Sequence, residues 1–260
     1  MYNKNDFISN LIAMGIKPTD AVMVHSSMKS IGEVAGGADT VIDAFQEYLS
    51  NGLFMTPAHT WAQMSAEYNI FDPATEPACV GIIPNLFLKR ENSFRSLHPT
   101  HSIVASGAGA EEYAKGEEFA TTPCPPGGCW DRLRSIHAKI LLVGVTHARN
   151  TFIHSIEEVL DVPERFTSEP TLFKIKMPDG NLREVSMYRH YNVHTAHISE
   201  SFDKLTDAYF ELGAAQKVTF GDAQCILCDA EKLFDVTQKV LSHEINCFID
   251  RESIPDEWWK

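Results

Sequence analysis

The stretch AVMVHSSMKSIGEVAGG, residues 21–37, decides the fold class of this chain. It begins with a short apolar run bounded by turn residues, which is typical of a buried β-strand. A polar loop follows and ends in a glycine pair, and the sequence from Ala38 to about Ser50 has helical periodicity. A second apolar run, Leu53–Thr56, comes soon afterwards. This order of strand, loop, helix and strand predicts an α/β unit, with the loop at the carboxyl end of the first strand.

Periodic segments on both sides of this unit extend the α/β pattern. Apolar residues in helical spacing predict helices, short apolar runs predict strands, and a Pro-Asp-Gly turn between two apolar runs predicts a β-hairpin. A long irregular stretch from Pro57 to Pro99 is expected to wall the active site, because loops of that length in a compact domain usually serve function. The predicted elements are helices over residues 6–16, 202–212 and 230–243, strands over 101–106, 139–145 and 218–227, and a hairpin over 172–188.

Composition places the chain among soluble globular proteins. Its 260 residues are 44% hydrophobic and 22% charged, and no shift in composition divides them, so we expect a single domain over 1–260. No apolar stretch reaches the roughly 18 residues of a membrane span, and the N-terminal residues lack the pattern of a signal peptide. We therefore expect a cytoplasmic protein. Six cysteines at irregular spacing do not make a disulfide framework.

The formal net charge of −13 limits the possible partners. It argues against nucleic acid and against an anionic membrane surface, since either would require a basic patch to neutralise phosphates. A cationic ligand is compatible with this charge. Buried apolar strands carry no information on quaternary contacts, so a monomer and a homodimer are equally allowed.

The segment Thr151–Glu158 carries the best catalytic signal. Asn150 or Thr151 can cap a helix there, and helical spacing places His154 beside Glu157 or Glu158 on one face. A neutral imidazole takes a proton from an amine or hydroxyl, while a neighbouring carboxylate fixes its tautomer and stabilises the imidazolium. The alternative is an ordinary surface histidine on a solvated helix face.

Two further polar segments are candidates for binding. The loop Ser26–Gly37 offers hydroxyls, backbone amides, Lys29 and a following helix N-terminus, which together suit phosphate groups. It matches neither the Walker loop nor the dinucleotide fingerprint, and a plain strand-to-helix connection is the alternative. Arg95–Ser102 contains two histidines, an arginine and two serines just ahead of a strand. Its alternative is a fixed loop whose side chains satisfy backbone groups.

The cysteines allow two alternative functions, a zinc site and a hydrolase with a cysteine nucleophile. Cys225 and Cys228, with His190, His194 and His197, have residue types found in zinc sites, although a buried strand explains the cysteines as well. Cys124 or Cys129 with a histidine would make a hydrolase, but neither has a papain-like local signature.

Several segments, taken in order, resemble the aminoglycoside 3-N-acetyltransferase family. They cover about residues 22–160, and the C-terminal Gly221-Asp222-Ala223 strand followed by a helix is also similar to family members. Each piece is modest, and their order makes the match specific. The matching stretches are Val24–Gly32, Gly36–Ala38, Phe71–Pro73, Gly81–Pro84, Arg95–Ser102, Leu141–Val145 and Thr151–Glu157.

The resemblance implies an α/β fold unlike that of the common GNAT acetyltransferases, with a central mixed sheet flanked by helices and a C-terminal β-hairpin and helix extension. It implies transfer of acetyl from acetyl-CoA to the 3-amino group of an aminoglycoside, without a covalent enzyme intermediate and without a metal. His154 would be the general base, helped by Glu157, and Glu67 and Asp72 would receive the ammonium groups of the substrate. The residues implied to hold coenzyme A are Ser26, Ser27, Lys29, Ser30, Gly32 and Ser102.

One departure from the family pattern concerns the acceptor. Family members often have further carboxylates shortly after the hairpin, whereas this chain has cationic or neutral side chains over Tyr188–His194. The departure weakens the expectation of strong aminoglycoside binding. Another primary amine as acceptor, or a coenzyme A-binding protein without turnover, are therefore the alternatives within the same fold.

Overall fold

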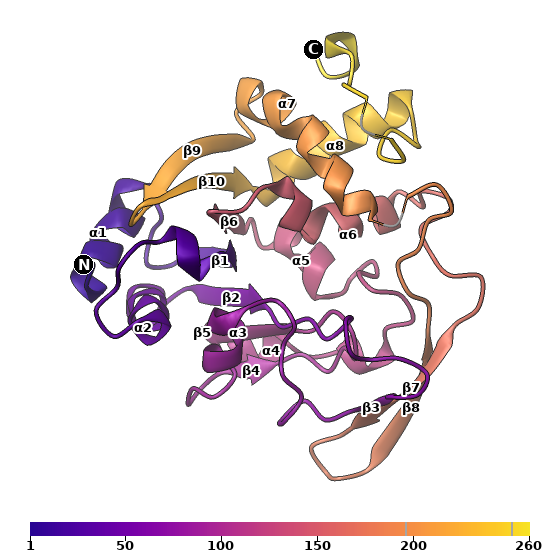
Figure 1. Ribbon diagram of the computed structural model, residues 1–260, viewed down its shortest axis with the longest axis horizontal. Coiled ribbons are helices and arrows are strands. Elements are labelled where there is room, and N and C mark those ends of the chain that lie inside the picture. The colour runs from indigo at the N-terminus through magenta and orange to yellow at the C-terminus, as the bar shows by residue number, and fades with distance from the viewer. Residues whose placement is uncertain (196, 251) are drawn as a thin grey trace.

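The computed structural model describes residues 1–195, 197–250 and 252–260. Its main feature is a seven-stranded sheet in the order β4-β5-β2-β1-β6-β10-β9 (Figure 1). The unit predicted from residues 21–56 forms the middle of this sheet, with β1 beside β2. The strands are β1 (Ala21–Ser26), β2 (Leu53–Pro57), β4 (Phe94–Arg95), β5 (Ile103–Gly107), β6 (Lys139–Val143), β9 (Ala215–Phe220) and β10 (Ala223–Asp229).

Strand β1 is parallel to both of its neighbours, and the outer strands are antiparallel. Val22 pairs with Phe54 of β2 on one side and with Lys139 of β6 on the other. Parallel strands require a crossover connection, and helix α2 provides it between β1 and β2. The predicted central mixed sheet is confirmed, and the carboxyl ends of β1, β2 and β6 lie at one edge of it.

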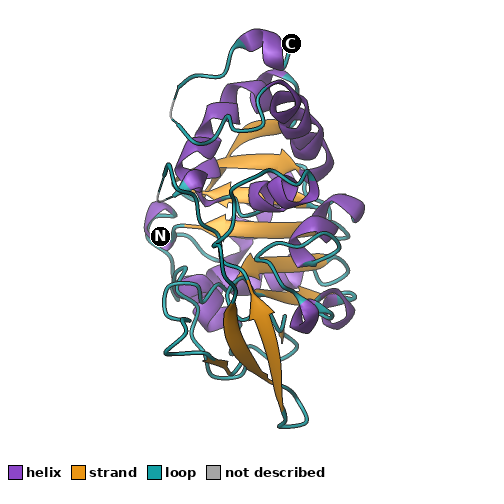
Figure 2. Cartoon of the chain, turned by 90° about the vertical axis from the view of Figure 1, so that its right-hand side faces the viewer, coloured by secondary structure: helices purple, strands orange, loops and turns teal. Residues whose placement is uncertain are grey.

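Helices cover both faces of the sheet (Figure 2). Side chains alternate along β1, so that Val22 and Val24 join one buried cluster and Met23 joins the other. Residues of α1, α2 and α3 fill the first cluster, and residues of α4 to α8 fill the second. The α-helices are α1 (Lys4–Ala13), α2 (Ala38–Tyr48), α3 (Ile82–Phe87), α4 (Ala110–Tyr113), α5 (Cys129–Ser135), α6 (Phe152–Val159), α7 (Thr206–Glu211) and α8 (Ala230–His243).

Short 3-10 helices complete the helical content of the described residues. They cover Met28–Ser30, Glu117–Phe119, His147–Arg149, Ile198–Leu205 and Asp256–Trp258.

The predicted hairpin belongs to a second, smaller sheet. Strands β7 (Thr171–Lys176) and β8 (Leu182–Met187) are antiparallel, and β7 also pairs in parallel with the short strand β3 (Ile70–Phe71). Phe71, Phe173 and Ile175 are among the residues of its own buried cluster. The hairpin projects from the end of the molecule that lies opposite to the C-terminus (Figure 2), and the chain that leaves β8 returns toward α6.

Two predicted elements differ from the structure. The strand expected over 218–227 is a hairpin, because Gly221 adopts a left-handed φ of 58° and turns the chain between β9 and β10. The helix expected over 202–212 is a 3-10 helix, Ile198–Leu205, which continues as α7. Helix α8 has the predicted bounds. Among the described residues, no helix has the length and apolar character needed to cross a membrane.

A substitution at Gly32 tests the close packing of the loop after β1 against Asp222. Its φ is +91°, and a Cβ there would collide with the carboxylate of Asp222, which already accepts a hydrogen bond from Tyr2. We expect Gly32→Ala to lower the free energy of unfolding by about 1–3 kcal/mol, measured by urea denaturation. Gly15→Ala is the matched control, because Gly15 has a φ of +77° with open space around it. An equal loss in both variants would mean that backbone strain, and not the Asp222 contact, is the cause.

Candidate active site

A cavity of about 710 Å³ opens beyond the carboxyl ends of β1, β2 and β6. Ligands of open α/β sheets bind at this edge, because the loops that leave the parallel strands gather there. Segments far apart in the sequence meet around the cavity. Its lining includes His25, Ser26, Pro57, His59, Trp61, His101, Arg149, Asn150, Thr151, His154, Arg165, Arg189, His190, Tyr191, Asn192 and Glu200.

His154 lies on α6 and lines the cavity, and its ring nitrogen Nδ1 contacts the carboxylate of Glu157. The distance from His154 Nδ1 to Glu157 Oε2 is 3.0 Å, and Glu157 Oε1 accepts a 2.5 Å hydrogen bond from Arg165 Nε. The side chains of His154, Glu157 and Arg165 are 14%, 1% and 3% exposed. The predicted pair is therefore assembled as the helical spacing indicated, and its third member, Arg165, comes from the loop beyond the helix.

The charge state of Glu157 follows from these contacts. Burial alone would raise the pKa of its carboxyl, but the hydrogen bond and charge of His154, together with Arg165, lower the pKa below its usual value. Glu157 is thus a carboxylate at neutral pH. A carboxylate acceptor fixes the proton of His154 on Nδ1, which leaves Nε2 as the basic nitrogen.

The predicted side-chain cap of α6 is wrong. Thr151 has helical dihedral angles and makes no capping bond, and its hydroxyl contacts His59 Nε2 at 3.0 Å instead. Asn150 does not cap either, because its amide faces His147 Nδ1 at 3.4 Å. The 3-10 helix that precedes α6 explains the difference. Carbonyls of Asn150 and Thr151 accept the first free N–H groups, those of Ile153 and His154.

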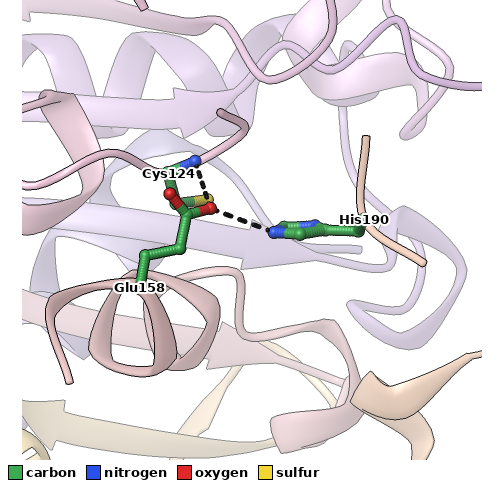
Figure 3. Close-up of side chains that lie close together, drawn as sticks. All are labelled: Cys124, Glu158 and His190. Atoms are coloured by element: carbon green, nitrogen blue, oxygen red, sulfur yellow. Dashed lines mark hydrogen bonds and ion pairs between the residues drawn. The ribbon is translucent and has the colours of Figure 1, made fainter. Parts of the chain in front are cut away.

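A second carboxylate on α6 holds a second histidine. Glu158 Oε1 lies 3.2 Å from His190 Nε2 and also accepts the backbone N–H of Cys124 (Figure 3). The imidazole of His190 stacks on that of His154, with ring centroids 4.1 Å apart. The alternative that helical spacing left open is thereby settled, with Glu157 on His154 and Glu158 on His190.

Burial is the main cause of the shifted pKa values of the ionisable side chains around His154. It raises the pKa of Glu158 to about 7, against hydrogen bonds from Thr122 and Cys124 that favour the carboxylate. It also lowers the pKa of His59, His101 and His190 well below the usual value, with neighbouring histidines adding to the effect. The imidazoles of His59, His101 and His190 at the cavity are therefore neutral near pH 7.

Cys124, Glu158 and His190 have potential metal-ligand atoms within 4.8 Å of one another (Figure 3). Hydrogen bonds already serve the Glu158 carboxyl, and burial raises the pKa of the Cys124 thiol well above its usual value. Hydrogen bonds of the Glu158 carboxyl thus account for its contacts with His190 and with the backbone N–H of Cys124. The expectation from the sequence that the enzyme uses no metal stays a prediction.

The residues implied to hold coenzyme A are only partly at the cavity. Ser26 lines it, while Ser27, Lys29 and Ser30 belong to the adjoining turn. Lys29 is exposed, whereas the Ser30 hydroxyl donates to the Gly144 carbonyl at 3.5 Å. Gly32 supplies the left-handed conformation that ends the turn. A coenzyme A role for this turn stays a prediction.

Ser102 has a structural position instead of a place at the cavity. Its hydroxyl donates to the Ala58 carbonyl at 2.7 Å and accepts from Arg95 Nε at 3.1 Å. Arg95 also donates to the carbonyls of Ala58, Pro73 and Glu76, which anchors the long stretch after β2. The fixed-loop alternative describes both side chains.

The two carboxylates predicted to bind substrate lie away from the cavity lining. Glu67 is exposed and accepts a hydrogen bond from Ser65 at 3.0 Å. Asp72 is paired with Lys176 of β7 at 2.8 Å, and this ion pair lowers the pKa of its carboxyl. Neither residue lines the cavity, and a role for them in substrate binding stays a prediction.

The cysteine alternatives do not fit their surroundings. Cys225 and Cys228 belong to different buried clusters on opposite faces of the sheet, so they cannot share a metal ion. Cys124 and Cys129 are fully buried, and burial raises the pKa of both thiols well above the usual value, which is unsuitable for a nucleophile.

Sequence reasoning missed His59, Arg165 and Thr151 as parts of the site. His59 follows β2 directly, and a polar residue at the carboxyl end of a parallel strand was an available signal. Arg165 lies in a segment without periodicity, so no local pattern marks it. His190 entered only through the zinc alternative, because its partner on α6 is 32 residues away.

The site thus has a histidine paired with a buried carboxylate at the loop edge of a three-layer α/β fold, and the match to a family model shows an enzyme of the acyltransferase class. The chain belongs to the family described as aminoglycoside 3-N-acetyltransferase, whose model matches residues 23–242.

Individual relatives agree with this assignment. Aminoglycoside N(3)-acetyltransferase III of Salmonella sp is 28% identical, over 94% of this chain and 96% of its own length. The structure of AAC-IIIb with CoASH has a TM-score of 0.80 at 21% identity, covering 98% of this chain and 99% of that one. A variant of AAC(3)-IVa in complex with a gentamicin has a TM-score of 0.81 at 24% identity, covering 95% of this chain and 91% of that one. The two structures establish the shared fold.

The raised pKa of Glu158 predicts that this carboxyl makes the folded protein less stable as pH rises. Its pKa is about 7 in the folded protein and near 4.5 in the unfolded chain, so the unfolded state releases the proton first as pH rises. As pH rises between these two values, deprotonation of Glu158 lowers the free energy of unfolding of the protein by up to about 3 kcal/mol. Glu158→Gln stays neutral, so we expect its melting temperature relative to wild type to increase from pH 5 to about pH 7 and to level off above that pH.

Glu111→Gln is the matched control for this experiment, because Glu111 is an exposed carboxylate outside the site. Its melting temperature relative to wild type should be independent of pH. A difference between Glu158→Gln and wild type that stays constant over the same range would contradict the raised pKa.

Proposed function

We propose that the protein is an acetyl-CoA-dependent N-acetyltransferase in which His154 is the general base. The observation that carries the proposal is the buried chain from Arg165 through Glu157 to His154, which ends at the cavity. Family membership supports acetyl transfer, and the shape of the site supports a base directed at a bound amine.

The chemistry assigns a role to each member of this chain. An alkylammonium must lose a proton before its nitrogen attacks, and His154 Nε2 is the atom that takes it. Glu157 stabilises the imidazolium that forms, and Arg165 keeps Glu157 ionised and in place. The new bond joins the amine nitrogen to the acetyl carbon, and the carbon–sulfur bond breaks. The nitrogen loses a second proton as the amide forms; of the two protons released, one goes to the departing thiolate to give the coenzyme A thiol and the other goes to solvent.

The turn after β1 is the proposed place for the coenzyme A part of acetyl-CoA, whose thioester would supply the activated acetyl group. Ser26 contributes a hydroxyl at the cavity, and the exposed Lys29 is suited to a phosphate. These residues fit the ligand, and the complex of AAC-IIIb with CoASH supports such a site in this fold. The Thr151 hydroxyl also lines the cavity and is the proposed donor to the carbonyl oxygen during attack.

An aminoglycoside 3-amino group is the acceptor that the relatives support. The family description and the gentamicin complex of the AAC(3)-IVa variant both favour it. Another primary amine is the second candidate, and the cavity lining favours it. Glu67 and Asp72 do not line the cavity, whereas Arg149, Arg165 and Arg189 do.

His154→Ala tests the proposed base. We expect the variant to lose at least about 100-fold in the rate of thiol release from acetyl-CoA, because a positioned general base contributes about 10²–10⁴-fold. The assay covers aminoglycosides, simple polyamines and amino sugars as acceptors. Coenzyme A affinity, measured by calorimetry, should change less than about twofold, which separates the chemical step from binding.

His137→Ala is the matched control, because His137 is exposed and pairs with Glu231 outside the cavity. It should retain wild-type activity. Full activity of His154→Ala would contradict the proposed role of His154 as the general base. Binding of coenzyme A without thiol release from any acceptor would instead favour a coenzyme A-binding protein without turnover.

A further inference from the structure

The charge that faces the cavity is opposite in sign to the charge of the whole chain. The chain has a formal net charge of −13, yet the described residues that line the cavity include Arg149, Arg165 and Arg189 against one acidic residue, Glu200. Charged groups in a concave site act on a ligand more strongly than distant surface charge, because low-dielectric walls focus their field. Glu157 compensates the charge of Arg165, so Arg149 and Arg189, against Glu200, supply the positive charge that an anionic group in the cavity would meet.

Arg165 has hydrogen-bonding capacity that its protein contacts leave unused. Its Nε donates to Glu157 and its Nη1 donates to the Pro163 carbonyl at 2.9 Å. Its Nη2 is buried and has no hydrogen-bond partner in the described structure, although the side chain lines the cavity and is only 3% exposed. A buried guanidinium with an unsatisfied N–H group is costly unless a ligand accepts from it.

Backbone pairing places the segment of Arg189 alongside that of Arg165, with Arg165 opposite Tyr191 and Arg189 opposite Thr167. The Tyr191 N–H donates to the Arg165 carbonyl at 2.9 Å, and the Thr167 N–H donates to the Arg189 carbonyl at 2.9 Å. An antiparallel bridge between Phe166 and His190 lies between these two hydrogen bonds. Arg189 Nη2 is fixed by the Trp61 carbonyl at 2.7 Å, and a planar guanidinium with further donors suits a carboxylate or phosphate.

The same region offers little to a cation. Glu157 is already committed to His154 and Arg165, and the nearby His59, His101 and His190 are neutral. A polycationic acceptor would meet arginines where its ammonium groups need carboxylates. Neutral imidazoles next to the base still permit a single amine to approach His154.

We propose that Arg165 and Arg189 form a subsite for an anionic group of the acceptor, so that the substrate is an amine that also carries a phosphate or carboxylate. This inference rests on the proposed acetyl transfer and specifies its acceptor. The phosphates of coenzyme A share this chemistry. We assign the subsite to the acceptor because Arg165 is hydrogen-bonded to Glu157, the partner of His154, whereas the residues implied to hold coenzyme A are mostly in the turn after β1.

Calorimetry on the enzyme saturated with coenzyme A tests the subsite without requiring turnover. The probes are glucosamine 6-phosphate and glucosamine, which differ only in the phosphate, and gentamicin as a polycation. We expect the phosphorylated amine to bind at least tenfold more tightly than glucosamine and more tightly than gentamicin. Arg189→Gln should abolish this preference and leave coenzyme A affinity unchanged.

Arg183→Gln is the matched control, because Arg183 lies on β8 and contacts Glu118 and Phe119 outside the cavity. It should retain the preference for the phosphorylated amine. Equal affinity for the two glucosamines, or no binding of either, would overturn the proposal.

Two other results would also overturn it. Tighter binding of gentamicin would indicate a polycation site, and weaker coenzyme A binding by Arg189→Gln would assign the arginines to the coenzyme. Because these measurements record binding alone, a failure of the proposed acetyl transfer would appear separately, as absence of thiol release with the phosphate preference intact.

Discussion

A buried carboxylate, that of Glu157, bonds the imidazole of His154 on one side and the guanidinium of Arg165 on the other. A carboxylate removed from water requires both partners, because an uncompensated charge in the interior is strongly destabilising. This requirement ties the loop that contains Arg165 to α6, and backbone hydrogen bonds then tie the segment after β8 to that loop. The position of the cavity wall thus depends on the same charge that orients His154.

The two neighbouring carboxylates of α6 have different electrostatic environments and therefore different roles. Glu157 has a cation beside it and a lowered pKa, so it remains ionised. Glu158 is buried without a cation of this kind, and its pKa is raised to about 7. Adjacent carboxyl groups with separated pKa values allow one to serve as a fixed charge and the other as a hydrogen-bonding group for His190.

Negative charge on the outside and arginines within give this molecule two distinct electrostatic regions. A ligand in the cavity lies closer to the lining arginines than to the negative charge of the outer surface, so the arginines act on it more strongly. The carboxylates that the family resemblance assigned to substrate binding lie elsewhere, with Asp72 paired to Lys176 in the small sheet. Membership of an acetyltransferase family therefore leaves the acceptor to be decided by side chains that differ within a shared fold.

The sequence by itself determined the α/β class, the strand–helix–strand unit over residues 21–56 and the pairing of His154 with Glu157, because periodicity and helical spacing are local properties. It did not determine the partners of that pair. Arg165, His190 and His59 reach the cavity through connections whose geometry no local pattern encodes, and burial sets the protonation of the two histidines only after the layers pack. Tertiary structure alone decided which charges face the substrate, since burial and proximity arise from contacts between distant segments.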